Sequence, residues 1–393
     1  MTWVVAIADS DSYLKWSAAT LRRLPSAYTS RQLVIANPVL PSAAQIRAAS
    51  AGPAEIGSFG AVRRILRSEQ PEVVLLAGTG PVVAALLATP ELQRADRPVL
   101  VTGMPGVSVP ASPRAVSLRA GCDLLVVHSR REQAEYAALA DQLAPGLRVG
   151  LATLPFLADP YLPPAVAAER SDLVFAAQAK VPATRPDREA ILLALAETQS
   201  AVVKLRAVDG EPQTHRERWP YPVLVDDLAR QGRIDPNAIR FSGGSMGAAL
   251  SVARGLVTVS STAALEAMAA GVPVLIISDF GVSAELINLV FAGSGCLGTL
   301  DDLRAGRFVH PDPAWSMANY FHPAADDDWL AILASLADAR AVGPLPRRVA
   351  ASGSRPTRAR RRLRLAVPAA GWRFVRQVRD RRVRGRPRRR RTG

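Results

Sequence analysis

The segment VTVSSTAALEAMAAGVPVLIISDFG, residues 257–281, contains a complete strand–helix–strand unit. Its first residues, 257–259, are β-branched, which is typical of a strand buried on both faces of a parallel sheet. Three hydroxyl residues follow them, and a helix starts there. Gly271 and Pro273 end that helix and begin a second apolar run. The segment therefore predicts a parallel α/β sheet.

Both halves of the chain repeat this alternation of short apolar runs and longer helical stretches. Strands are expected in the first half at Val4–Ala8, Gln32–Ala36, Val73–Ala77, Val99–Thr102, Leu124–His128 and Arg148–Thr153. They are expected in the second half at Leu173–Ala177, Ala201–Leu205, Ile239–Phe241, Leu256–Val259 and Val274–Ser278. Helices fall between them, and the last two are expected at Ser283–Phe291 and Asp328–Ala339. The pattern predicts two Rossmann-like, doubly wound domains, 1–160 and 165–342, followed by a tail, 343–393.

The composition limits the class of protein. A chain of 393 residues that is 49% hydrophobic can bury a core in each of two domains. No uninterrupted apolar run reaches about 18 residues, so no transmembrane helix is expected. The N-terminus lacks the basic start and the cleavage site of a signal peptide. Cys122 and Cys296 suggest neither a disulfide framework nor a zinc site, so we expect a cytoplasmic protein.

The basic charge belongs to the tail. From Arg347 onward there are 19 arginines and one acid, whereas the rest of the chain has 30 basic and 33 acidic residues. Such dense arginine blocks repel one another and usually stay unfolded in isolation. Leu365–Val378 mixes apolar residues with arginines and could form an interfacial helix on an anionic membrane. We expect a nearly neutral body held peripherally at the inner face of the membrane.

Polar residues follow five predicted strands of the second half, where open parallel sheets bind their ligands. They are Gln178, Lys180, Lys204, Arg206, Ser242, Gly243, Gly244, Ser245, Ser260, Ser261, Thr262, Asp279, Phe280 and Gly281. Only three lysines occur in the chain, and two of them, Lys180 and Lys204, are in this set. A compact ammonium suits a phosphate contact. His215, in the polar loop after Lys204, is a further candidate for the donor.

Ser260, Ser261 and Thr262 precede the helix of the opening segment. A helix N-terminus with added hydroxyl donors suits a phosphate. Thr262 and Glu266 are four residues apart and therefore share one helix face. The open alternative is that the hydroxyl residues only cap the helix and that Glu266 only suits its dipole.

The first half offers candidates for catalysis and for acceptor binding. Asp9 and Asp11 follow the first strand and could remove a proton from an acceptor hydroxyl, or Asp11 could simply cap the next helix. His128 ends the fifth predicted strand and is either an acid/base group or an ordinary hydrogen-bonded histidine. The candidates for acceptor binding are Ser10, Gly78, Thr79 and Gly103. Glycines there allow a substrate to approach closely, although ordinary turns would use them as well.

Metal and cofactor motifs are not expected. Gly78-Thr79-Gly80 does not extend to GxGxxG, which disfavours a nicotinamide site. We assign no acidic pair to a metal-binding DxD motif, and Asp326-Asp327-Asp328 is better explained as a cap of the last helix. A leaving group would instead be stabilised by Lys180, Lys204, His215 and the helix start at Ser261. The nucleotide sugar would be a substrate and no cofactor would be needed.

The stretch ALEAMAAGVPVL resembles the donor-binding segment of GT-B glycosyltransferases. The resemblance implies that the nucleotide sits on the second domain, with Glu266 on the ribose and Ser260, Ser261 and Thr262 on the phosphates. The paired serines also resemble those of bacterial sialyltransferases and Kdo transferases, which use CMP-sugars and a His-Pro motif. His215 precedes Arg216 here, so that motif is incomplete.

Three further segments, ADSDSYLKW, VTGMPG and LVVHSRRE, resemble an uncharacterised actinobacterial family described as glycosyltransferases. The expected function is therefore metal-independent transfer of a sugar from a nucleotide-sugar donor to a cell-surface glycan or lipid-linked acceptor. The alternatives are a sugar-nucleotide epimerase on the same fold and a nucleic-acid-binding protein that uses the arginine-rich tail. The body lacks a recognition motif for nucleic acid and is slightly acidic, which disfavours the last alternative.

Overall fold

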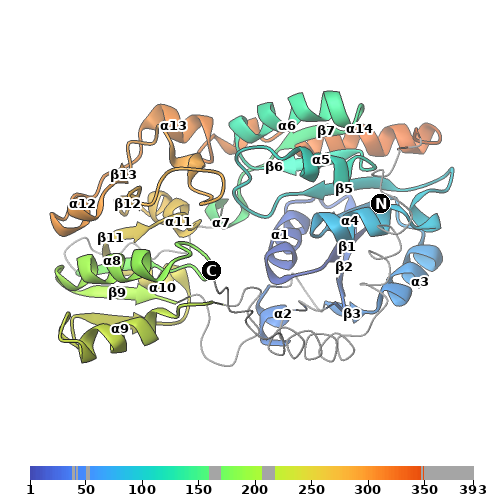
Figure 1. Ribbon diagram of the computed structural model, residues 1–393. Coiled ribbons are helices and arrows are strands. Elements are labelled where there is room, and N and C mark those ends of the chain that lie inside the picture. The colour runs from blue at the N-terminus through green and yellow to red at the C-terminus, as the bar shows by residue number, and fades with distance from the viewer. Residues whose placement is uncertain are drawn as a thin grey trace, which may run out of the picture.

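The computed structural model describes residues 1–37, 40, 43–49, 54–158, 170–205, 217–346 and 348. Two parallel sheets, one from each half of the chain, form the body of the protein (Figure 1). The predicted fold class, two Rossmann-like α/β domains, is confirmed. The predicted interfacial helix at 365–378 and most of the tail lie outside the described residues.

The first sheet has seven strands in the order β3-β2-β1-β4-β5-β6-β7. Their bounds are Thr2–Ala8 (β1), Tyr28–Ile35 (β2), Glu55–Gly57 (β3), Val73–Ala77 (β4), Val99–Gly103 (β5), Leu124–Val127 (β6) and Arg148–Leu151 (β7). The helices are α1 (Asp11–Arg22), α2 (Ala43–Ala49), α3 (Phe59–Glu69), α4 (Gly80–Leu87), η1 (Pro90–Leu92), α5 (Pro113–Arg119), α6 (Arg130–Leu143) and α7 (Pro155–Ala158). All six predicted strands are present, and the short edge strand β3 is an addition.

The strand β1 shows why the central strands of this sheet are almost entirely apolar. Val5 and Ile7 belong to the core cluster on one face, while Val4 and Ala6 belong to the cluster on the other face. Successive side chains of a strand point to opposite faces, so a strand covered by helices on both sides must be apolar at every position.

The last helix of the chain, α14 (Trp329–Val342), packs on the first sheet. Trp329, Leu333 and Leu336 lie in the same core cluster as Val4 of β1. A side chain at Gly150 in β7 would come within 3.0 Å of Trp329, so the glycine permits the close approach of the helix. Figure 1 shows α14, in red, beside β7 and α6. The chain thus returns to the first half after the second half is complete.

The second sheet has six strands in the order β10-β9-β8-β11-β12-β13. Their bounds are Asp172–Ala176 (β8), Ala201–Lys204 (β9), Ile239–Ser242 (β10), Ala253–Thr258 (β11), Val274–Ile277 (β12) and Leu297–Gly298 (β13). The helices are α8 (Arg185–Ala196), α9 (Tyr221–Arg230), α10 (Met246–Ser251), α11 (Ala263–Ala269), η3 (Leu289–Phe291), α12 (Leu300–Arg304), α13 (Pro313–Ala318) and η4 (Ala324–Asp326). The short strand β13 is an addition to the predicted set.

The helix expected at Ser283–Phe291 is wrong, because only the single turn η3 forms there. The side chain of Asn288 donates to the carbonyl of Gly281 and accepts from the N–H of Ser283. Ile287 has a left-handed backbone with a φ of 60°. A side chain that bonds the local backbone in this way offers it an alternative to a helix.

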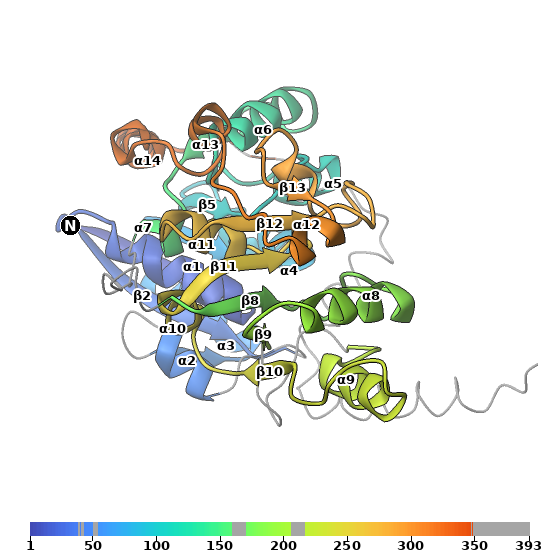
Figure 2. The same ribbon diagram turned by 90° about the vertical axis from the view of Figure 1, so that its left-hand side faces the viewer.

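The loop after β5 joins the two halves. Val107 and Val109 of this loop pack in a core cluster of the second half, together with Leu265 of α11. From the other direction, the hydroxyl of Tyr320 donates to Glu132 of α6 at 2.5 Å. Figure 2 shows the second half in front of the first from this side. The junction is therefore packed with side chains from both halves.

Candidate active site

The residues that follow β1 and β11 meet near this junction. A Cβ at Gly106, in the loop after β5, would lie 3.9 Å from Thr262 at the start of α11. The short helix α7 contacts both α1 and α11, and Figures 1 and 2 show it beside them. The candidate residues on α1 and α11 are therefore neighbours across the junction, although they are more than 240 positions apart in the chain.

Ser260 is anchored inside the second half. It is buried, and both its N–H and its hydroxyl donate to Oε1 of Gln178, at 3.1 and 2.9 Å. The carbonyl of Gln178 in turn accepts from Arg188, a buried arginine that also donates to the carbonyls of Ala179, Pro182 and Trp219. This geometry gives Ser260 a positioning role, through which it ties the end of β11 to the loop after β8.

Ser261 and Thr262 keep hydroxyl groups for a ligand. The N–H of Ser261 donates to Thr258, and its Oγ accepts from the N–H of Ala263, which leaves the hydroxyl hydrogen available. Thr262 is the N-cap of α11 and makes no side-chain capping bond. Simple capping therefore explains Ser261 in part and does not explain Thr262.

Glu266 lies one turn after Thr262 on α11, and its carboxylate makes no hydrogen bond or ion pair with any described residue. Burial raises the pKa of its carboxyl group, and the charges of Lys15 and Lys204 lower that pKa. Lys204 is 5% exposed, and its ammonium donates to the carbonyl of Leu205 at 2.8 Å. Burial lowers the pKa of Lys204, while the charge of Glu266 raises it. A carboxylate without a hydrogen-bond or ion-pair partner, on which the charges of two lysines act, is the most distinctive feature of this site.

The remaining donor candidates differ in their surroundings. Lys180 is exposed in the loop after β8, and Gly243 and Gly244 are exposed after β10. Gly244 has a φ of 81°, a conformation that disfavours any other residue there. Arg206 and His215 lie outside the described residues.

Asp9, at the end of β1, is buried and fully used within the protein. One oxygen accepts from the N–H and the hydroxyl of Thr79, at 2.8 and 2.6 Å, and the other accepts from Ser10 at 3.0 Å. Burial raises the pKa of its carboxyl group against these hydrogen bonds and the charge of Arg119. Arg119 completes the network by donating to the carbonyl of Gly78. Asp9 therefore holds together the turns after β1 and β4.

Asp11 is arranged differently. It begins α1 and pairs with Lys15 one turn later, at 2.8 Å between Oδ2 and Nζ. Its other oxygen is buried and has no hydrogen-bond partner in the described part of the chain. Of the two predicted bases, Asp11 is thus the one with an oxygen left to accept a proton.

His128 and Gly103 have internal partners. The ring of His128 is 1% exposed, Nε2 accepts from Trp16 and Nδ1 lies 2.8 Å from the carbonyl of Ala152. Burial lowers the pKa of His128 to about 4. A Cβ at Gly103 would lie 2.1 Å from the ring of Trp16. Trp16 packs against both His128 and Gly103. These two residues therefore serve the packing of the first half, and neither leaves a surface on which an acceptor could bind.

The sequence did not predict a role in the site for Lys15 or Arg188. Lys15 could have been found from its spacing of four residues to Asp11, which puts both side chains on one helix face. Arg188 carries no such signal, because its partners are backbone carbonyls and the carboxylate of Glu217 in loops that the sequence does not place.

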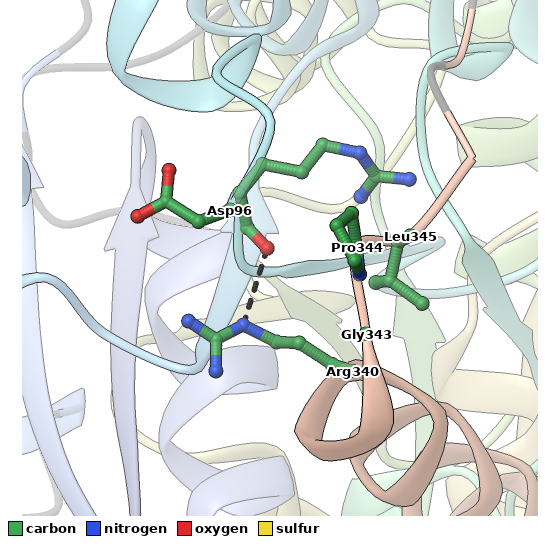
Figure 3. A pocket seen from close by; sticks show the side chains of 6 residues that line it. Asp96, Arg340, Gly343, Pro344 and Leu345 are labelled. Carbon is green, nitrogen blue, oxygen red and sulfur yellow. Dashed lines mark hydrogen bonds between the residues drawn. The ribbon is translucent and has the colours of Figure 1, made fainter.

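A shallow pocket lies elsewhere, between the loop before β5 and the end of α14 (Figure 3). It is lined by Asp96, Arg97, Arg340, Gly343, Pro344 and Leu345. Because Arg97 precedes β5, the pocket is at the amino end of the strands, opposite the candidate site. In the described ranges, no three His, Cys, Asp or Glu residues gather so that they could hold a metal ion. No helix of those ranges is long and apolar enough to cross a bilayer.

Two Rossmann-like domains with polar strand ends at their junction define the protein as one of GT-B type. Residues 4–336 match a family model, "Putative glycosyltransferase (DUF6716)", and the chain belongs to this family. No curated protein sequence matches the chain significantly.

Solved structures share the fold. Anabaena Alr3699/HepE in complex with UDP and glucose has 15% identity and a TM-score of 0.52, over 87% of this chain and 100% of that one. The UDP-GlcNAc 2-epimerase of Methanocaldococcus jannaschii has 13% identity and a TM-score of 0.53, over 86% and 99%. S. aureus MnaA with UDP has 12% identity and a TM-score of 0.53, over 85% and 94%. At these identities the likeness shows the fold alone.

Proposed function

We propose that the protein transfers a sugar from a nucleotide-sugar donor to a glycan or lipid-linked acceptor, without a metal ion, in cytoplasmic polysaccharide biosynthesis. The observation that carries this proposal is the unpaired carboxylate of Glu266 at the junction of the halves. It lies one helical turn from Thr262, whose hydroxyl makes no capping hydrogen bond. A carboxylate can accept two hydrogen bonds from the hydroxyls of a ribose. The hydroxyls and the ammonium groups nearby suit the phosphates.

In this proposal the donor lies on the second half. Glu266 accepts from the ribose, while Ser261, Thr262, Lys180 and Lys204 neutralise the phosphates and the developing charge of the leaving nucleotide. Ser260 positions this segment through Gln178. Gly243 and Gly244 leave room for close approach, and His215 stays a predicted donor contact. Whether the nucleotide is UDP, as in two of the similar structures, or CMP is decided by the binding test below.

The acceptor lies on the first half. Asp11 takes the proton from the acceptor hydroxyl as that oxygen attacks the sugar carbon in line with the leaving phosphate. Asp9 holds the turn that carries Asp11, and Ser10, Gly78 and Thr79 shape the surface around it. His128 and Gly103 support this wall through Trp16. Closure of the halves excludes water, which would otherwise compete with the acceptor.

The first test is thermal unfolding of the protein with UDP, CMP, GDP, dTDP and their common sugar conjugates. A nucleotide at 100 times its dissociation constant adds about 2.7 kcal/mol of stability. We expect one nucleotide to raise the melting temperature, and Glu266→Ala to remove that shift. Glu197→Ala is the matched control, because Glu197 is exposed at the far end of α8. A shift that persists in Glu266→Ala contradicts the site, and no shift with any nucleotide contradicts the function.

Epimerisation of the nucleotide sugar is the second candidate, since one of the similar structures is a UDP-GlcNAc 2-epimerase. An epimerase would isomerise the donor without any acceptor. NMR of the sugar after incubation with the protein separates the two: a new isomer indicates an epimerase, and an unchanged sugar with slow release of nucleotide indicates a transferase.

For the tail we propose attachment to an anionic membrane. The start of the tail is docked on the first half, where Arg348 pairs with Asp123 and the carbonyl of Pro346 accepts from Arg97. The arginine-rich part therefore leaves from the acceptor half, which suits a lipid-linked acceptor. Co-sedimentation with anionic liposomes should be lost when the chain ends after Arg348, a cut that spares these contacts. Binding that survives the cut contradicts the proposal.

A further inference from the structure

Lys15 has no part in the donor and acceptor assignments above, yet it lies at the junction. Its side chain is 59% exposed and pairs with Asp11. An isolated ion pair of this kind on a helix surface contributes little to stability, so it does not explain why a lysine occupies this position. Nearly every other cation of the chain is an arginine.

The charge of Lys15 also reaches the second half. The short helix α7 contacts both α1, which carries Lys15, and α11, which carries Glu266. Across this contact the charges of Lys15 and Lys204 both lower the pKa of Glu266, whose carboxylate makes no hydrogen bond or ion pair with the described residues. Lys204 comes from the end of β9 in the second half, and Lys15 comes from α1 in the first half. Two of the three lysines of the chain therefore act on one carboxylate, one lysine from each half.

The side chains of the two lysines differ in how freely they can move. Lys204 is almost buried and held by the carbonyl of Leu205, whereas Lys15 is exposed on a flexible stem. A flexible ammonium can exchange one oxygen partner for another at little cost, because it is a point charge without the fixed fork of an arginine. Lys15 is thus suited to a partner that is present only part of the time.

We infer that Lys15 is the cation with which the first half holds the phosphate of a nucleotide bound to the second half. The inference rests on the proposed donor site. When the phosphate arrives, the ammonium exchanges Asp11 for a phosphate oxygen and draws the halves together. The exchange also frees the second oxygen of Asp11 on the side where the acceptor would bind. In this way Lys15 would couple binding of the donor to the release of Asp11 for its role as the base.

The test is isothermal titration calorimetry of the full chain with UDP, CMP, GDP and dTDP, and then with the nucleoside of whichever nucleotide binds. Lys15→Met removes the charge and keeps most of the side chain. Arg22→Met is the matched control, since Arg22 is an exposed cation in the last turn of the same helix. We expect Lys15→Met to weaken nucleotide binding about tenfold, which corresponds to about 1.4 kcal/mol. Nucleoside binding should be unchanged in both variants.

Each other outcome has a definite meaning. Equal nucleotide affinity in Lys15→Met and wild type overturns the inference and leaves the donor site standing. An equal loss of nucleoside and nucleotide affinity also overturns it, because Lys15 would then act on the structure and not on the phosphate. A wild-type protein that binds no nucleotide overturns the proposed function itself.

Discussion

Trp16 donates its indole N–H to Nε2 of His128 at 2.8 Å, and this bond links α1 to the end of β6 inside the first half. Nδ1 of the same ring lies against the carbonyl of Ala152 and must therefore carry the hydrogen. The imidazole is neutral, because a second ring hydrogen would point at the indole N–H. Protonation of His128 and an intact Trp16 contact exclude each other.

The first prediction is that acid weakens the fold through His128. Its pKa is about 4 in the folded protein and about 6.5 in an unfolded chain. Between these values the unfolded state holds a proton that the folded state lacks, so stability is complete above the upper value and falls as the pH falls toward the lower one. The loss amounts to about 3 kcal/mol. The loss is measured as the difference between the free energies of unfolding in urea at the two ends of this pH range.

The matched variants are His128→Gln and His310→Gln, since His310 is exposed. His310→Gln should keep the full pH dependence, and His128→Gln should lose most of it. A wild-type stability that does not change between the two pH values would refute the neutral, buried histidine.

The second prediction concerns Ser260 and Gln178. Because both donors of Ser260 bond the same oxygen of Gln178, either substitution by alanine should weaken nucleotide binding and cost about 1–3 kcal/mol of stability. The double variant should be scarcely worse than the single ones. A double-mutant cycle in urea and in the nucleotide titration measures the coupling. Additive effects would mean that Ser260 contacts the ligand independently.

The predicted base is tested by separating Asp11 from Asp9. Asp11→Asn should lower the rate of nucleotide release from its sugar conjugate about 10²-fold or more, because the acceptor proton then has no destination. Its nucleotide affinity and melting temperature should stay near wild type. Asp9→Asn should instead lower the melting temperature, because it disturbs the bonds to Thr79 and Ser10.

Asp141→Asn, an exposed change on α6, controls for the loss of one negative charge in the first half. The opposite result would be that Asp11→Asn keeps the wild-type rate, whereas Asp9→Asn loses the rate and keeps the wild-type stability. In that case Asp9, and not Asp11, would be the base.

The sequence predicted the sheets well and the site only in part, for physical reasons. Buried parallel strands are apolar at every position, as in Val73–Ala77, and such runs are visible without any tertiary information. Gly103 shows the limit: it follows a strand as a ligand-binding glycine would, but its space is filled by Trp16, which no local pattern places there. The charge of Lys15 acts on Glu266 only because two separate halves of the chain dock.

The fourth prediction concerns the place where the tail begins. Asp123 is 1% exposed and accepts from Arg97 at 2.7 and 2.8 Å, from the N–H of Leu100 at 2.9 Å and from Arg348 at 3.3 Å. Asp123→Asn leaves buried arginine charge without its partner and should cost about 3–5 kcal/mol in a urea titration. Asp96→Asn is the control, since Asp96 lines the pocket of Figure 3 beside Arg97 but is 70% exposed. Similar losses in both variants would contradict the buried network.

The return of α14 to the first sheet has a consequence for biosynthesis. Trp329, Leu333 and Leu336 complete the core that begins with Val4, so the first half is built from both ends of the chain. Domains generally fold as units during synthesis, with the N-terminal one first. Here the ribosome must translate the entire second half before the first can close its core. Until then the newly made strands β5, β6 and β7, which α14 contacts, have an uncovered apolar face, and a chaperone could bind there.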